Sequence, residues 1–202
     1  MTRQDLIAAL RANRSLYGVN IESAVDRLAD YYELLIEHNS IMHLVAPCSA
    51  EEFATRHILE SLTMLEFLPK NANFIDIGSG GGLPALPCLI VRDDLTATLV
   101  ESKAKKAAFL ELAIQNLGLD KRASVENKQF AEVVPGRAQF VSCRAIDKFT
   151  ELLPRILKWA ERRNLLLFGG PAIRSLLQDY RVPFVPRLMP LSEQRYLFIS
   201  KR

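Results

Sequence analysis

The sequence has few of the residues that mark disulfide-rich, metal-binding or membrane proteins. Only three of the 202 residues are cysteines, Cys48, Cys88 and Cys143, and their spacings of 40 and 55 residues suit neither a disulfide framework nor a metal site. The longest apolar run, residues 83–91, contains two prolines. The N-terminus lacks the basic start and long apolar centre of an export signal. We therefore expect reduced core thiols, no metal, no membrane contact and a cytoplasmic protein.

The net charge is small but unevenly distributed. The chain carries 26 Lys and Arg against 23 Asp and Glu, yet residues 150–202 hold ten basic and only four acidic side chains. Such asymmetry is typical either of a nucleic-acid contact or of a solvated face. The 49% of hydrophobic residues is enough to build the core of a single domain.

The first seventy residues are predicted to be helical. Asn20 is a candidate N-cap, and apolar residues follow it at helical spacing up to Leu35. Ser49 and Glu52 have the spacing of a capping box at the start of a further helix, which we expect to extend to Leu65. Residues 1–70 are thus interpreted as a helical N-terminal extension.

From residue 71 to residue 202 the pattern changes to alternating short strands and helices, which predicts a parallel sheet covered on both faces. The last two strands are close enough in sequence to form an antiparallel hairpin. Strands are expected at residues 74–77, 95–101, 123–126, 139–143, 165–168, 181–189 and 194–200, and helices at 83–91, 103–117, around 131 and at 148–159.

Four of the nine glycines, Gly78, Gly80, Gly81 and Gly82, lie between a predicted strand and a predicted helix. Glycines there permit a tight turn and let a ligand approach the backbone, while the helix supplies oriented N–H donors. Glu101 ends the next strand, 19 residues after Gly82. An acidic side chain at that point can accept hydrogen bonds from the two hydroxyls of a ribose.

Three classes of ligand are bound by glycine-rich loops of this kind. A dinucleotide fingerprint needs glycine at position 83, where this chain has Leu83, and a Walker loop needs a lysine that is absent here. Asp76 at the head of the loop would repel a pyrophosphate but would suit the ammonium group of a methionine moiety. The loop therefore favours S-adenosylmethionine, with a nicotinamide-dependent oxidoreductase as a distant alternative.

Several strings resemble the RsmG (GidB) family, the methyltransferases that modify N7 of a guanine in 16S ribosomal RNA. The family's R-H-I-L-D-S-L occurs as R-H-I-L-E-S-L at residues 56–62, and its G-x-G-x-G-L-P occurs at residues 78–84. Its D-S-x-x-K-R-x-x-F-L is E-S-K-A-K-K-A-A-F-L at residues 101–110, and its S-R-A is C-R-A at residues 143–145. Its closing G-E-R-x-L-x-x-x-x-K is similar to residues 192–201.

The resemblance implies a class I methyltransferase fold, α/β and Rossmann-like, with a mostly parallel seven-stranded sheet whose last strand is antiparallel. In this reading Glu101 contacts the ribose, and Arg144 lies where the methionine end of the cofactor meets the incoming base; without the family, a surface ion pair would be the simpler role for Arg144. The loop and the resemblance together give these candidate cofactor-binding residues: Asp76, Gly78, Ser79, Gly80, Gly82, Leu83, Glu101, Ser102, Gln129, Phe130 and Arg144.

The implied partner is 16S rRNA or the small ribosomal subunit, bound by a monomer. Phosphate contacts dominate the affinity for RNA, so basic residues are the candidates for this surface. The candidate substrate-binding residues are Arg56, His57, Lys103, Lys105, Lys106, Arg144 and Arg195.

No catalytic base is predicted. Guanine N7 has an exposed lone pair, so no proton must leave before attack, and positioning and exclusion of water can supply the catalysis. His57 is interpreted as a structural hydrogen-bonding residue rather than as a base.

The chain departs from the family where RNA or the adenine edge would be read. Lys128 and the pair Gln129-Phe130 replace a basic residue and a pair that includes Glu, His43-Leu44-Val45 replaces N-L-T, and Ala85 replaces a glycine. The basic residue of the family's L-K-G is missing from residues 167–170. Two alternatives therefore stay open: a divergent methyltransferase with another substrate, and a non-catalytic RNA- or ribosome-binding protein of the same fold.

Overall fold

A seven-stranded sheet with the order β3-β2-β1-β4-β5-β7-β6 forms the centre of the computed structural model, which describes residues 2–144 and 146–201. The first five strands are parallel, and β7 lies antiparallel between β5 and β6. This topology confirms the expected fold class. The strands are β1 (Asn73–Ile77), β2 (Thr96–Val100), β3 (Ala123–Glu126), β4 (Phe140–Arg144), β5 (Asn164–Gly169), β6 (Val185–Leu188) and β7 (Tyr196–Ser200).

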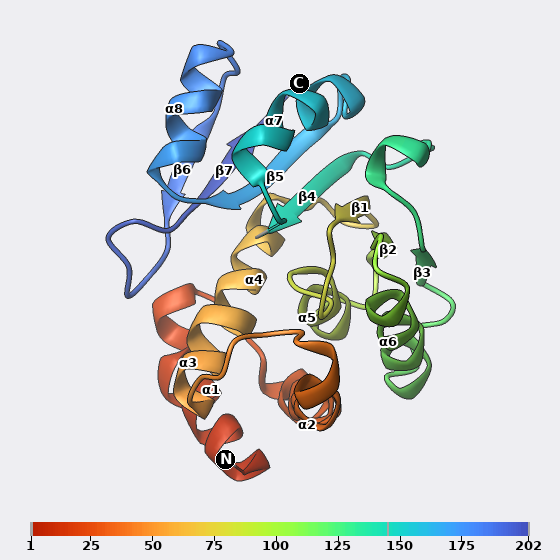
Figure 1. Ribbon diagram of the computed structural model, residues 1–202. Helices are drawn as coiled ribbons and strands as arrows, with labels where there is room; N and C mark the ends of the chain where they lie inside the picture. Colours follow the sequence, from red (N-terminus) through yellow and green to blue (C-terminus); the bar gives the residue numbers. More distant parts are fainter. Residues whose placement is uncertain (1, 145, 202) are drawn as a thin grey trace.

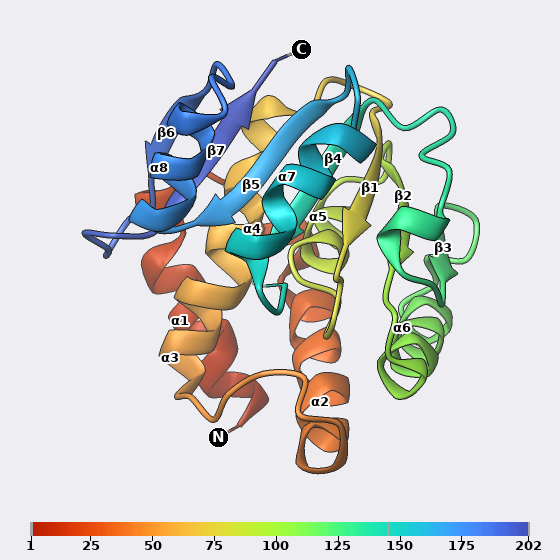
Figure 2. The ribbon, with the colours of Figure 1, turned by 45° about the horizontal axis from the view of Figure 1, so that its top comes forward.

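Helices cover both faces of the sheet, as the alternation of strands and helices predicts. Figures 1 and 2 show α7 and α8 on one face and α2, α5 and α6 on the other. The helices are α1 (Arg3–Tyr17), α2 (Val25–Met42), α5 (Ala85–Val91), α6 (Ala104–Asn116), α7 (Phe149–Trp159) and α8 (Pro171–Asp179), with 3₁₀ turns η1 (Glu22–Ala24) and η4 (Phe130–Glu132).

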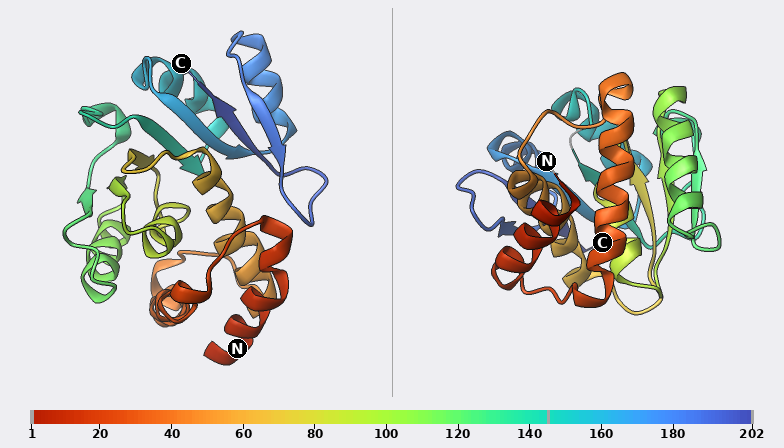
Figure 3. Two further views of the ribbon diagram at one scale, coloured as in Figure 1. Left: turned by 180° about the vertical axis from the view of Figure 1, so that it is seen from behind. Right: turned by 90° about the horizontal axis from the view of Figure 1, so that it is seen from below.

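The N-terminal helices share one hydrophobic core with the sheet. Leu28 and Leu35 of α2 belong to the same buried cluster as Phe74 of β1 and Leu99 of β2. A second buried cluster lies on the other face, where α7 and α8 pack against β4 and β5. Figure 3 shows the N-terminal helices from behind and from below, gathered on one side of the sheet. Residues 2–70 are therefore packed into the body of the protein.

The helical segment after Ser49 contains a π-helix. Ser49 Oγ accepts a hydrogen bond from the Glu52 N–H at 3.0 Å, which is one half of the expected capping box, whereas the Glu52 carboxylate pairs with Arg56. The run continues through α3 (Ala50–Glu52), the π-helix η2 (Phe53–Leu59), α4 (Glu60–Leu62) and the 3₁₀-helix η3 (Thr63–Phe67). Single-turn π segments are frequent at functional sites. Here the π-helix carries Arg56 and His57.

Several element boundaries differ from the prediction. The helix expected from residue 83 begins at Ala85, because the glycine loop continues to Pro84. Asn20 Oδ1 accepts from the Glu22 N–H at 3.2 Å, but it does so at the 3₁₀ turn η1, and α2 begins only at Val25. Helix α8 was not predicted, because its short apolar pattern follows two glycines and a proline, which are breaker signals.

The structure adds three observations on the composition. Cys88 and Cys143 are buried free thiols, whereas Cys48 is only half-buried. Within residues 2–144 and 146–201, no helix has both the length and the apolarity needed to cross a membrane. No group of three or more His, Cys, Asp or Glu side chains in that same part of the chain is placed to hold a metal ion.

Candidate active site

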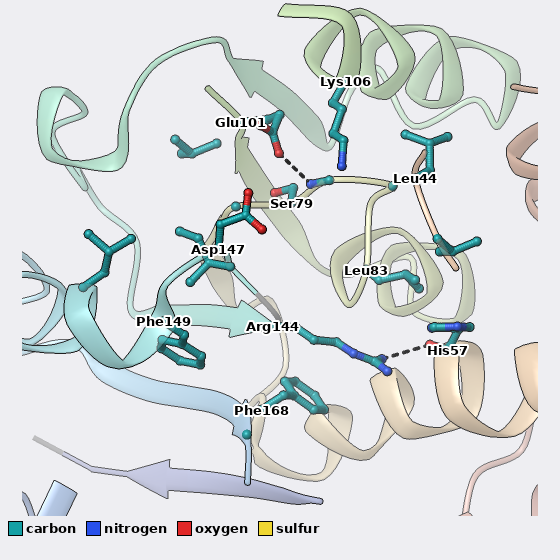
Figure 4. A pocket seen from close by; sticks show the side chains of 18 of the residues that line it. Leu44, His57, Ser79, Leu83, Glu101, Lys106, Arg144, Asp147, Phe149 and Phe168 are labelled. Carbon is teal, nitrogen blue, oxygen red and sulfur yellow. Dashed lines mark hydrogen bonds between the residues drawn. The ribbon is translucent and has the colours of Figure 1, made fainter. Parts of the chain in front are cut away.

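A cavity of about 810 Å³ opens at the carboxyl ends of the parallel strands. This is where open α/β sheets bind ligands, and the volume is typical of ligand pockets. Its walls come from the loop after β1, the ends of β2, β4 and β5, the π-helix η2 and the loop before β7. Figure 4 shows two ends: Glu101 and Ser79 lie at one, and Arg144, His57 and Phe168 lie at the other.

The glycine loop forms the floor of the first end. Gly78 and Ser79 donate their backbone N–H groups to the Val100 carbonyl at 2.8 and 3.1 Å, which fixes the turn against β2. Gly78 has a φ of +70°, and a Cβ there would lie 2.9 Å from the side chain of Ile146. Glycine is therefore required at position 78 for both conformation and space.

Glu101 has the geometry expected of a ribose-binding carboxylate. Its side chain is buried, Oε2 accepts from the Gly80 N–H at 2.9 Å, and Oε1 accepts from the Lys103 N–H at 2.8 Å. Each oxygen keeps a further lone pair that can accept a hydroxyl proton. Asn127 Nδ2 donates to the Glu101 carbonyl at 2.8 Å and holds the backbone from the other side. The residues present thus fit a nucleoside with a free ribose.

The turn at residues 128–132 closes this end of the cavity. Gln129 and Phe130 line the cavity, as expected, and so does Ser102. The Gln129 N–H donates to Glu132 Oε2 at 2.9 Å. The Phe130 ring meets the edge of Trp159 at a centroid distance of 5.6 Å. The turn is therefore held in place by contacts within the protein.

Three of the predicted ligand contacts lie off the cavity wall. Asp76 was expected to face an ammonium group, but its carboxyl is fully buried beneath the loop and accepts from Ser142 Oγ at 2.6 Å. Gly82 has a φ of +93°, and a Cβ there would lie 2.3 Å from Leu86, so it serves the packing of the loop on α5. Lys105 is exposed on α6 and does not line the cavity.

The burial of Asp76 affects its ionisation. Transfer of a carboxyl from water into the interior disfavours the charged form. This desolvation raises the pKa of Asp76 to about 7, despite the hydrogen bond from Ser142 Oγ, which lowers it. The group is thus a titratable part of the scaffold beneath the loop.

At the second end of the cavity, Arg144 is held by the helical run that begins at Ser49. Its Nη1 donates to Ser61 Oγ at 2.9 Å and to the His57 carbonyl at 3.3 Å. Its Nη2 donates to the Arg56 carbonyl and lies 3.5 Å from Glu60 Oε2. Only 14% of the side chain is exposed. The structure thus excludes a surface ion pair as its role.

Glu60 joins two arginines that are distant in sequence. Its Oε1 accepts from Arg195 Nε at 2.9 Å and lies 2.8 Å from Arg195 Nη2, while Oε2 faces Arg144. The Glu60 side chain is only 3% exposed. Glu60 was not predicted as a site residue, although it occupies the acidic position of the R-H-I-L-E-S-L string, because an acid is not expected among residues that bind RNA.

His57 lines the cavity as a neutral ring. Burial, with the positive charges of Arg144, Arg56 and Arg195, lowers its pKa to about 4. Its ring packs against Phe53 at a centroid distance of 5.2 Å, so the contact observed is aromatic packing rather than the expected hydrogen bond. Arg56 is about half exposed and pairs with Glu52 on the same helical run.

The remaining basic residues lie at the rim. Lys103 and Lys106 line the cavity, and Lys103 Nζ lies 3.0 Å from the exposed carboxylate of Asp147. Figure 4 shows the Lys106 side chain directed from α6 toward the glycine loop. Ala145, the third residue of the C-R-A string, lies outside the described residues.

Most of the apolar residues that line the cavity were not predicted from the sequence. Phe149 and Phe168 contribute rings to the cavity, and no signal in the sequence separates them from ordinary core residues. The other cavity residues that were not predicted include Leu44, Val45, Ile146, Asp147 and Met189.

Known proteins with similar sequences are methyltransferases of ribosomal RNA. A family model described as rRNA small subunit methyltransferase G matches residues 24–170. A protein named ribosomal RNA small subunit methyltransferase G from Neisseria meningitidis serogroup C is 34% identical over 203 residues, which is 96% of this chain and 97% of that protein. Its namesake from Sorangium cellulosum is 37% identical over 158 residues, 74% of this chain and 66% of that protein.

Solved structures with similar folds include methyltransferases. A putative O-methyltransferase from Klebsiella pneumoniae has a TM-score of 0.60 at 12% identity and covers 85% of this chain and 89% of its own. TYW2 from P. horikoshii, solved in complex with MeSAdo, has a TM-score of 0.55 at 15% identity over 72% of this chain and 63% of its own. At these identities the structures show the fold alone. The sequence matches go further: this chain belongs to the rRNA small subunit methyltransferase G (GidB) family.

Proposed function

We propose that this chain transfers a methyl group from S-adenosylmethionine to N7 of a guanine in 16S rRNA of the small ribosomal subunit, and that it does so in the cytoplasm. The observation that carries the proposal is a single cavity with the Glu101 carboxylate at one end and the Arg144 guanidinium at the other. Membership of the family supports the choice of rRNA as the substrate.

The chain's own residues fit the cofactor at the first end. Glu101 offers two carboxylate oxygens to the ribose hydroxyls, and the open space at Gly80 lets a ligand approach the backbone. Gln129 and Phe130 face the position that the fit assigns to the adenine ring. When bound, the cofactor supplies an electrophilic methyl group on a positively charged sulfur.

The second end performs no acid–base chemistry in this proposal. Guanine N7 attacks with a lone pair that is already free, so the protein's task is to align the base and to exclude water. Because the pKa of His57 is lowered to about 4, its ring is neutral at neutral pH. It therefore adds no like charge to the side chains of Arg144 and Arg195. Leu83, Phe149 and Phe168 line the cavity with apolar surface that displaces water.

Basic side chains at the rim supply the affinity for RNA. Arg56, Lys103 and Lys106 line the opening, and all of them keep contact with solvent. Arg195 extends the basic surface to the loop that precedes β7. Because phosphate contacts release bound counterions, we expect RNA binding to weaken steeply as the salt concentration rises.

The test is mass-spectrometric mapping of rRNA methylation in cells with and without the gene. We expect one 7-methylguanine of small-subunit rRNA to disappear with the gene and to return with the wild-type chain. Glu101→Ala should not restore it, whereas Glu126→Ala, which removes a carboxylate one strand away and off the cavity wall, should. Unchanged rRNA, with cofactor binding intact by calorimetry, would reject the proposal in favour of another substrate or a non-catalytic role.

A further inference from the structure

An arginine beside a guanine that must react at N7 raises a chemical conflict. Arginine commonly reads guanine by donating two hydrogen bonds, one to O6 and one to N7. A hydrogen bond to N7 would occupy the lone pair that the proposed methyl transfer needs. Arg144 can therefore serve the reaction only if its donors are directed elsewhere.

The structure directs them into the protein. Nη1 has two N–H groups and two acceptors, Ser61 Oγ and the His57 carbonyl. Nη2 has two N–H groups and faces the Arg56 carbonyl and the Glu60 carboxylate. Three hydrogen bonds from the two Nη atoms thus go to protein acceptors, and Nη2 also lies within ion-pair distance of Glu60. The edge of the group that usually reads a base faces the helical run.

The flat faces of the guanidinium have different surroundings. Its central carbon lies over the Phe168 ring, 5.6 Å from the ring centroid. In Figure 4, Phe168 lies on one side of the Arg144 side chain, and Leu83 and Ser79 lie on the other. The exposed 14% of the Arg144 side chain belongs to the cavity wall. Phe168 itself is 6% exposed, so its ring supports Arg144 rather than offering a free surface.

We propose that Arg144 is a stacking platform for the target guanine: its N–H edge is bound to the protein, one face rests on Phe168, and the other face receives the base. This inference rests on the proposed function and specifies how the same site recognises its substrate. Unstacked RNA bases commonly stack on arginine guanidinium planes. Glu60 and Phe168 are positioning residues in this arrangement, because they act on the base through Arg144.

Stacking leaves N7 free to react, and the interaction between the base and the guanidinium changes when the base gains a positive charge. N7 forms a bond to the methyl carbon while the carbon–sulfur bond breaks, and the bonding electron pair stays on sulfur. The positive charge thereby passes from sulfur to the purine. A positively charged purine is repelled by the guanidinium face that attracted the neutral base, so the same platform favours release of the methylated product.

The test compares two small-subunit rRNA transcripts, one made with guanosine triphosphate and one with its 7-deaza analogue, which lacks the N7 acceptor. Binding is measured in the presence of S-adenosylhomocysteine, so that no methyl group is transferred. We expect the wild-type protein to bind both transcripts with affinities that agree within about twofold. If Arg144 read N7 by hydrogen bonding, the 7-deaza transcript would bind about tenfold more weakly or worse.

Variants test the platform itself. Arg144→Lys keeps the positive charge but removes the planar guanidinium. We expect this variant to bind both transcripts about tenfold more weakly, as for the loss of a stacked base. Phe168→Leu should weaken both by about threefold through loss of the aromatic support, and Phe168→Tyr should retain wild-type affinity. The circular-dichroism spectrum and the midpoint of thermal unfolding show whether each variant is folded.

The possible results distinguish failure of the stacking inference from failure of the proposed function. A wild-type protein that methylates the ordinary transcript but discriminates strongly against the 7-deaza one, with the discrimination lost in Arg144→Lys, overturns the stacking inference alone. A wild-type protein that binds neither transcript, and does not bind the small ribosomal subunit either, overturns the proposed function and this inference with it. Equal binding of both transcripts by wild type, with a parallel loss in Arg144→Lys, supports the platform.

Discussion

At the Glu101 end of the cavity the contacts join residues that are close in sequence or lie on adjacent strands, whereas at the Arg144 end they join distant parts of the chain. Glu101 bonds to backbone groups 21 and 2 residues away. Arg144 reaches Ser61, 83 residues away, and Glu60 reaches Arg195, 135 residues away. The first end is a local strand–turn–helix unit, and the second depends on assembly of the whole fold.

This difference predicts that the two ends can be damaged separately. Changes at the Glu101 end should affect cofactor binding while the fold survives. Changes at the Arg144 end should affect stability and RNA binding together, because the same groups hold the π-helix, β4 and the C-terminal hairpin in contact. The following predictions test that separation.

We expect the largest effect from Gly78→Arg. The new side chain would start from a position where even a Cβ lies 2.9 Å from Ile146, at a φ of +70° that strains any non-glycine residue, and it would project into the cofactor end. Cofactor affinity should fall by at least about a thousandfold, a loss of about 4 kcal/mol. Calorimetry measures it. Gly118→Arg is the matched control, since Gly118 has a φ of +62° and open space around it.

The next largest effect concerns pH and lies beneath the Glu101 end. Because burial raises the pKa of Asp76 to about 7, the folded protein holds a proton there that the unfolded chain releases near pH 4. Stability should therefore decrease as the pH rises from about 4 to 7, by up to about 4 kcal/mol, and then level off. Asp76→Asn should abolish this slope in denaturant unfolding measured across that range; an unchanged slope in the variant would assign the dependence to other groups.

At the Arg144 end, Glu60→Gln should destabilise the fold. It leaves Arg144 and Arg195 without the carboxylate they share, and removal of one partner from a buried ion pair costs about 3 kcal/mol. Urea unfolding measures the change in free energy. Glu66→Gln breaks a comparable pair with Arg187 in which the acid is 55% exposed, and we expect a cost below about 1 kcal/mol. If the two variants lost the same free energy of unfolding, burial would not distinguish the Glu60 pairs from the Glu66 pair.

The smallest effect is expected at the rim. Lys106 lines the cavity and Lys105 does not, although they are neighbours on α6. Lys106→Gln should weaken RNA binding by about fivefold and reduce the salt dependence by the equivalent of about one phosphate contact. Lys105→Gln should change the affinity by less than about twofold. Filter binding at several salt concentrations distinguishes the two variants.

The Glu101 end of the cavity could also be predicted from the sequence more fully than the Arg144 end. The strand, the glycine turn and Glu101 are close in sequence, so their spacing alone indicated their chemistry, and the structure places Gly78, Gly80 and Glu101 on one wall. Asp76 and Gly82 were the exceptions at this end, and Asp76 shows why. A sequence pattern gives the position of a side chain along a strand but does not say which face of the turn it occupies, and this carboxyl faces Ser142 in the interior.

The Arg144 end could be predicted only in part. The family resemblance identified Arg144 and Arg195, but it gave no reason to bring Glu60 between them, because that contact spans 135 residues. The π-helix could not be predicted either, because in so short a segment the spacing of its apolar residues cannot be distinguished from that of an α-helix. Phe168 became a functional candidate only when the fold placed its ring beneath the guanidinium.

The proposed reaction requires that one cavity bring a methyl donor at the Glu101 end to a guanine N7 at the Arg144 end. The most direct measurement incubates the purified protein with methyl-labelled S-adenosylmethionine and unmodified small-subunit rRNA, digests the RNA and identifies the labelled nucleoside. We expect the label to be recovered as 7-methylguanosine. Label in any other nucleoside, or none from a protein that binds the cofactor, would contradict it.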